Sequence, residues 1–146
     1  MLQFSLPFIT NLQVLNLSRS RFGDTMVPSV VEALKAAPKI THLDLTNVAW
    51  TGFGLRAFAD GYLADFNPKH LISLDLTSNK FSDIDEVYHF GQAVGLCVSL
   101  RKLILRRMRI TAKVFEALAK GFTAQLTHIN LDFNKIERAG MLSLAK

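Results

Sequence analysis

The chain has 146 residues, of which 49% are hydrophobic and 20% are charged, and its formal net charge is +5. These values exclude a disordered polymer and indicate a single domain, residues 1–146, large enough to bury a core. No apolar run approaches the roughly 18 residues that a membrane-spanning helix needs, so no membrane is expected among its partners. A single cysteine, Cys97, excludes an internal disulfide framework and suits a reducing, cytoplasmic location.

Five segments of eleven residues align without gaps, and they begin at Leu12, Ile40, Leu71, Leu100 and Leu126. In chain order they read LQVLNLSRSRF, ITHLDLTNVAW, LISLDLTSNKF, LRKLILRRMRI and LTHINLDFNKI. Counted within each unit, positions 1, 4 and 6 are aliphatic, and position 11 is Phe, Trp or Ile. The alternation around positions 3 to 7 predicts a β-strand whose positions 4 and 6 face the core.

The segments between these units have the periodicity of amphipathic helices. Their predicted apolar stripes are Val27, Val30, Val31 and Leu34; Leu55, Phe58, Ala59, Tyr62 and Leu63; Ile84, Val87, Tyr88 and Val94; and Val114, Leu118 and Phe122. Thr51 and Thr111 are predicted N-caps, and Ser82 with Asp85 has the spacing of a capping box. One strand and one helix per unit predict an α/β solenoid with a concave parallel sheet and convex helices.

The pattern L-x-x-L-x-L-x-x-N-x-Φ followed by a helix resembles leucine-rich repeats, and the unit length and helical returns resemble the ribonuclease-inhibitor-like subclass. Asn79 and Asn134 at position 9 match best. Ser20, Val48 and Met108 replace that Asn elsewhere, and the last two lack its hydrogen bonds, so irregular loops are expected there. The resemblance implies a horseshoe segment of about five repeats that recognises a protein partner inside the cell.

The fourth and fifth units concentrate basic and apolar residues on the predicted concave face. The predicted partner-binding residues are Lys102, Ile104, Arg106, Arg107, Arg109, His128, Asp132 and Phe133. The arginines are expected to bind acidic groups of a protein, with Phe133 and Ile104 in apolar contact and Asp132 as an orienting acceptor. The alternative is a merely solvated outer face, with Arg106 paired to Asp132 and Lys102 to Asp75.

Two other chemistries are less favoured. Position 10 is basic in four units and forms a rim that suits phosphates, but Asp44, Asp75 and Asp132 on the same face would repel nucleic acid. No hydrolase, phosphate-loop or zinc-protease motif is present, so neither catalysis nor a cofactor is expected. His42 and His128 share a row but lie three strands apart, on the order of 14 Å, too far for one metal ion.

The two ends of the array lack the polar terminal repeats that such arrays need. One expectation is that the chain is a segment of a longer solenoid. The other is that partner subunits cover the ends in a permanent assembly, which would make the protein a structural subunit.

Overall fold

The computed structural model describes residues 9–81, 83–123 and 125–136. Its five strands are β1 (Val14–Asn16), β2 (His42–Asp44), β3 (Ser73–Asp75), β4 (Lys102–Ile104) and β5 (His128–Asn130). They form one parallel sheet in the order β1-β2-β3-β4-β5. Each strand falls within one of the predicted units, and the predicted register is confirmed, since Leu15, Leu43, Leu74, Leu103 and Ile129 pair across the sheet. The strands end at position 5 and are shorter than predicted.

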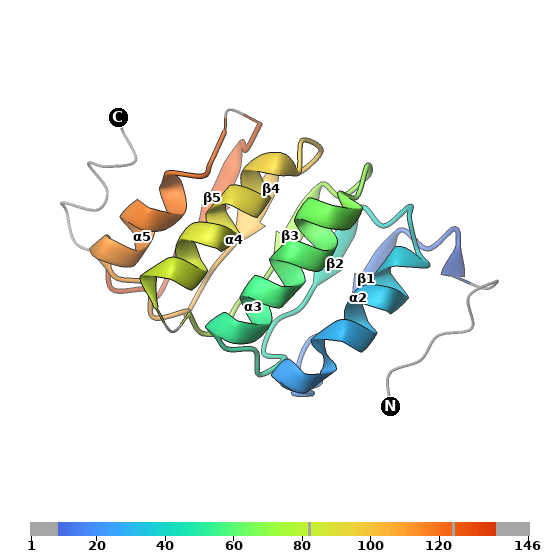
Figure 1. Ribbon diagram of the computed structural model, residues 1–146, viewed down its shortest axis with the longest axis horizontal. Coiled ribbons are helices and arrows are strands. Elements are labelled where there is room, and N and C mark those ends of the chain that lie inside the picture. Colours follow the sequence, from blue (N-terminus) through green and yellow to red (C-terminus); the bar gives the residue numbers. More distant parts are fainter. Residues whose placement is uncertain (1–8, 82, 124, 137–146) are drawn as a thin grey trace.

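Helices cover one face of this sheet (Figure 1). They are η1 (Asp24–Met26), α2 (Val27–Lys35), α3 (Gly52–Phe58), η2 (Ala59–Phe66), α4 (Ile84–Leu96) and α5 (Ala112–Ala119). The alternation of strand and helix along the chain therefore gives the predicted two-layered solenoid. Residues 137–146, where the alternation of strand and helix would place a further helix, lie outside the described residues.

The core lies between the two layers. The leucines at positions 4 and 6 of the second, third and fourth units are buried, and every residue of the predicted helical stripes except Ile84 and Tyr88 packs in the same core. An aromatic series runs from Trp50 through Phe58 and Tyr62 to Phe66, with successive ring centroids 5.2, 5.4 and 5.7 Å apart. Because these rings are large and closely packed, they supply much of the apolar area buried by the second repeat.

The predicted stripe of α4 is wrong in part. Ile84 and Tyr88 are each 43% exposed, whereas Val87, Phe90 and Val94 are buried. Residues spaced by three, four and seven share a helix face, so Val87, Phe90 and Val94 form one buried stripe, and Ile84 and Tyr88 lie outside it. The predicted stripe included these two exposed residues and left out Phe90.

The predicted caps are confirmed at one helix and altered at two. The Thr111 hydroxyl accepts a hydrogen bond from the Val114 N–H at 3.3 Å. Thr51 precedes α3, but its hydroxyl donates to the Asp24 carboxylate and does not cap the helix. Asp83 caps α4 by accepting from the Glu86 N–H at 2.9 Å, while Ser82 lies outside the described residues.

Asparagine at position 9 ties adjacent repeats together. Asn79 is 3% exposed; its side chain accepts from the Trp50 N–H at 3.1 Å and donates to the carbonyls of Leu45 and Leu76 at 2.9 Å. Asn134 makes equivalent bonds between the fourth and fifth repeats. In the three repeats without this Asn, position 10 takes a positive φ, at Arg21, Ala49 and Arg109. The expected irregularity is therefore a change of one backbone angle.

Glycines allow α4 to approach the end of α5 closely. A Cβ on Gly95 would lie 2.1 Å from the Gly121 carbonyl oxygen, and one on Gly91 would lie 2.4 Å from that of Leu118. Both obstacles are backbone atoms, which cannot turn aside as a side chain does. The close packing of these repeats therefore depends on glycine.

Candidate partner-binding surface

The face of the sheet opposite the helices presents two rows of side chains. Position 3 forms the row Val14, His42, Ser73, Lys102 and His128, and position 5 forms the row Asn16, Asp44, Asp75, Ile104 and Asn130. Both rows have the composition predicted from the aligned units. The alignment of the five units therefore predicts which side chains lie on the concave face.

Position 5 has a structural task that the sequence reasoning missed. Asn16, Asp44, Asp75 and Asn130 each accept a hydrogen bond at 2.9 Å from the N–H two residues further on. Such Asx turns end the strand by giving the backbone an alternative to sheet pairing. The signal was visible as Asn or Asp two residues before Ser, Thr or Asp. In the fourth repeat this position is Ile104, which has no acceptor and presents a half-buried apolar side chain instead.

The loops after the strands share a left-handed residue at position 8. These residues are Arg19 (φ 65°), Asn47 (52°), Ser78 (62°), Arg107 (52°) and Phe133 (62°). Asn tolerates this conformation, whereas a bulky side chain adopts it at a cost. The repeat therefore imposes a left-handed backbone conformation at position 8, and of these five residues Phe133 is the least suited to that conformation.

Arg106, Arg107 and Phe133 form a basic–aromatic cluster. The guanidinium carbons of Arg106 and Arg107 lie 5.2 and 4.7 Å from the centroid of the Phe133 ring. These distances are those of cation–π contacts. The ring is nevertheless 65% exposed. Two of the predicted arginines and the predicted aromatic anchor thus lie together at the carboxyl ends of β4 and β5.

The alternative ion pairs do not form. Within the described residues, neither Arg106 with Asp132 nor Lys102 with Asp75 is an ion pair. Asp132 is exposed, and its backbone carbonyl accepts from the Arg107 N–H at 3.2 Å. The carboxylate of Asp75 is occupied by its own turn. These contacts leave the arginine charges of the cluster without a carboxylate partner inside this part of the chain.

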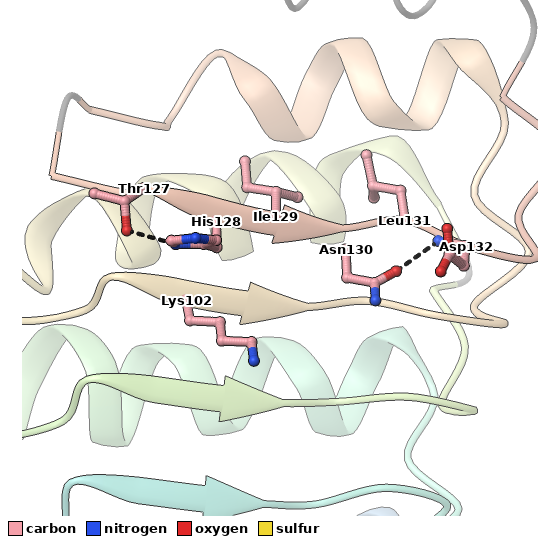
Figure 2. A pocket seen from close by; sticks show the side chains of 7 residues that line it. All are labelled: Lys102, Thr127, His128, Ile129, Asn130, Leu131 and Asp132. Carbon is pink, nitrogen blue, oxygen red and sulfur yellow. Dashed lines mark hydrogen bonds between the residues drawn. The ribbon is translucent and has the colours of Figure 1, made fainter.

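A hollow of about 470 Å³ lies at the edge of β5 (Figure 2). It is lined by Lys102, Thr127, His128, Ile129, Asn130, Leu131 and Asp132. Figure 2 shows Ile129 and Leu131 pointing away from the face that carries Lys102 and Asn130. The hollow therefore brings together Lys102, His128 and Asp132 of the predicted set. Arg109 lies further along the loop after β4, and Ile104 lines a separate hollow of about 230 Å³ together with residues of β1, β2 and β3.

A hydroxyl group borders the His128 ring. The Thr127 hydroxyl donates to the Arg101 carbonyl at 3.2 Å and lies 2.9 Å from Nδ1 of His128. The cross-strand neighbour of His128 is Lys102, so both residues stand on the same face of the sheet.

The groups with perturbed acidity lie in the core and not in this surface. Burial raises the pKa of the Cys97 thiol and the pKa of the Tyr62 hydroxyl. In residues 9–81, 83–123 and 125–136 no group of three or more His, Cys, Asp or Glu side chains has the arrangement of a metal site. None of the helices in these residues is long and apolar enough to cross a membrane.

Comparisons with known proteins bear on the fold. A family model described as "Leucine Rich repeat" matches residues 67–84 and 125–145, which include the eleven-residue units of the third and fifth repeats. The chain folds as a leucine-rich-repeat solenoid. No curated protein matches the sequence of this leucine-rich-repeat chain significantly.

Two solved structures are similar to this leucine-rich-repeat solenoid. The C-terminal domain of tropomodulin from Caenorhabditis elegans is 15% identical with a TM-score of 0.68, over 96% of this chain and 84% of that one. Leiomodin-1 actin-binding site 2 is 17% identical with a TM-score of 0.69, over 96% of this chain and 83% of that one. At these identities the likeness establishes the architecture.

Proposed function

We propose that this leucine-rich-repeat chain is a non-enzymatic module that binds an acidic protein surface through the basic–aromatic cluster of its concave face. The observation that carries the proposal is the position of Phe133, which lies against two guanidinium groups and yet is 65% exposed. An exposed aromatic ring beside arginines is typical of interface hot spots.

The backbone supports a binding role for Phe133. Its left-handed conformation costs a bulky residue on the order of 1 kcal/mol, and its ring gains little burial in return. Asn47 occupies the same position of the second repeat with less strain. Strained residues of this kind cluster where function requires a particular side chain. A partner that covers the ring would supply the missing burial.

The surrounding residues extend the surface in two directions. Arg109 continues the positive charge along the loop after β4, while Lys102 adds a positive charge beside His128 and the acceptor Asp132 at the hollow at β5. Ile104 supplies an apolar contact inside the concave face. A partner with carboxylates around an apolar centre matches this arrangement of a hydrophobic core and a charged rim.

The similarity to leiomodin-1 actin-binding site 2 supports a protein partner and makes actin the first candidate to test. Membership of the ribonuclease-inhibitor-like subclass and a cytoplasmic location are parts of the same proposal. Both rest on the unit length, the helical returns and the single cysteine.

The test is a double charge reversal, Arg107→Glu with Arg109→Glu. We expect it to abolish capture of protein partners from cell extract, and co-sedimentation with actin if actin is the partner, while the melting temperature stays nearly unchanged. The matched control is Arg19→Glu with Arg21→Glu. These residues occupy positions 8 and 10 of the first repeat and have the same left-handed backbone. Equal loss of capture and stability in the first variant would make its arginines structural and contradict the proposal.

A nuclease treatment of the extract separates this function from nucleic-acid binding. Protein partners that persist after nuclease support the proposal. Loss of every partner after nuclease would instead make the basic rim a nucleic-acid surface.

A second candidate function is that of a structural subunit held through its ends. Within the described residues, β1 and β5 each pair with one neighbouring strand. An unpaired strand edge is a template for another chain. Sedimentation velocity tests this prediction: a concentration-dependent assembly that survives Arg107→Glu with Arg109→Glu would favour it over binding by the concave face.

A further inference from the structure

The loops that lead from each helix into the next strand form one rim of the molecule, here called the strand-entry rim. They comprise residues 36–41, 67–72, 97–101, 120–123 and 125–127, and lie in a row along the upper edge of Figure 1. None of these residues is Asp or Glu, whereas Lys39, Lys69, Arg101 and Lys120 are cationic. The opposite rim, in contrast, carries Asp83 and Asp132 among its basic residues. The strand-entry rim therefore has a single sign of charge.

A hollow of about 370 Å³ opens in this rim between the second, third and fourth repeats. It is lined by Thr41, Lys69, His70, Ile72, Ser99 and Arg101. Three of these six residues carry nitrogen donors on side chains that come from two different repeats. The hollow is thus built for a group that accepts hydrogen bonds.

The walls of the hollow are held by hydrogen bonds to the backbone. The Ser99 hydroxyl donates to the Leu71 carbonyl at 2.7 Å, and that of Thr41 donates to the Gln13 carbonyl at 3.1 Å. One terminal nitrogen of Arg101 donates to the Val98 carbonyl at 2.7 Å, which leaves its other nitrogens for a ligand. The Lys69 ammonium has a long contact of 3.4 Å with Asn67 and keeps free donors. In the described part of the chain no ion pair neutralises either cation.

Exposed aliphatic side chains occur in and next to the hollow. Ile72 lines it and is 42% exposed, while Leu96 and Val98, just before the lining residue Ser99 in the chain, are 57% and 65% exposed. Acidic residues lie in the flanking elements: Asp65 is in the last turn of η2, Glu32 pairs with Lys35 at 3.3 Å, and Asp44 and Asp75 end β2 and β3. The hollow therefore offers cationic hydrogen-bond donors, with aliphatic side chains next to them for apolar contact.

We propose that the strand-entry rim binds an acidic protein segment, with one carboxylate in the hollow between Lys69 and Arg101 and an aliphatic neighbour against Val98. A protein segment fits better than a bilayer because the donors line a recess, whereas a planar surface meets protruding groups. It fits better than nucleic acid because bases stack on exposed aromatic rings, and His70 supplies the single ring among the residues that line this hollow. This site is separate from the basic–aromatic cluster and does not depend on it.

The probe is a short peptide with two Glu-Leu pairs in a Gly-Ser background, compared with its Lys-Leu counterpart. Amide chemical shifts of the whole chain report where each peptide binds. We expect the Glu-Leu peptide to shift residues 39–41, 69–72 and 97–101, the Lys-Leu peptide to have no effect, and added salt to weaken binding.

Lys39→Glu with Lys69→Glu should weaken binding of the Glu-Leu peptide about fivefold or more, because two surface charges change from attraction to repulsion. Its matched control is Lys80→Glu with Lys135→Glu, the same change of net charge on the opposite rim. Val98→Ser tests the apolar contact with every charge intact, and we expect weaker binding there too.

Equal weakening by the control pair, or shifts that lie outside the rim, would overturn the assignment. So would binding of phosphatidylserine vesicles or duplex DNA, with the same rim residues shifted, in place of the peptide. Each of these results would identify a different kind of occupant.

Discussion

Replacing Asn79 by alanine tests whether the buried asparagine holds the second and third repeats together. Asn79→Ala removes three hydrogen bonds, to the Trp50 N–H and to the carbonyls of Leu45 and Leu76. The site is 3% exposed, so water does not readily replace the lost amide. The three backbone groups are left without this partner in an apolar surrounding.

The expected loss follows from these contacts. At about 1 kcal/mol of net stability per hydrogen bond, three bonds give a loss of about 3 kcal/mol in the free energy of unfolding. Domains of this kind are stable by about 5–15 kcal/mol, so the loss is a large share of the total. It corresponds to a fall in melting temperature of about 10 °C.

Urea unfolding followed by circular dichroism measures the loss directly. Asn134→Ala is the matched control, because it occupies the same position of the fifth repeat and makes four such bonds, but is only half-buried. Since water replaces part of its bonds, we expect it to lose about 1–2 kcal/mol. A smaller loss for Asn79→Ala than for Asn134→Ala would refute the role assigned to burial.

Two further predictions concern packing and pH. Gly95→Ala places a methyl group against the Gly121 carbonyl and should lower the free energy of unfolding, measured by urea titration, by about 2–3 kcal/mol. The control Gly61→Ala meets the methyl groups of Val31, the nearer at 3.3 Å, and should be nearly neutral. Equal losses of stability in the two variants would contradict the role of the backbone contact. Burial raises the pKa of Cys97, so above the ordinary thiol pKa of about 8.5 the unfolded chain loses a proton that the folded chain keeps, and stability falls with rising pH. Cys97→Ala should reduce that alkaline fall in stability between pH 8 and 10, and an unchanged slope would show that the thiol does not contribute.

The architecture was predictable because every unit repeats the same constraint. The aliphatic residues at positions 4 and 6 have no other way to be buried than in a parallel sheet covered by helices. The register follows, since a slip by one residue would turn Leu74 or Leu103 toward solvent. The positions of Lys102, Ile104 and His128 on the concave face were therefore implied by the alignment alone.

Features set by contacts between repeats were not predictable. The stacking of Arg106 and Arg107 on Phe133 depends on the left-handed turn at position 8, which no residue type at that position announces. The buried stripe of α4 was missed in part because Ile84 and Tyr88 are as apolar as the residues that pack. The role of Gly95 was not predictable, because glycine occurs both in turns and where two backbone segments approach closely, and the sequence alone does not distinguish these cases.

The turn made by the position 5 side chain has a consequence for how such a surface can diversify. In four repeats this residue terminates the strand, so exchanging it for a new recognition group would perturb folding and binding together. Position 3 of those repeats takes no part in the turn and is free to vary, whereas at position 7 the Thr77 hydroxyl donates to the Asp75 carboxylate and supports the turn of the third repeat. Ile104 shows the exception: the fourth repeat lacks the turn-forming side chain, and its neighbours Leu103 and Leu105 remain fully buried. New specificities should therefore arise first at position 3, and at position 5 only in repeats whose core holds the strand end without that side chain.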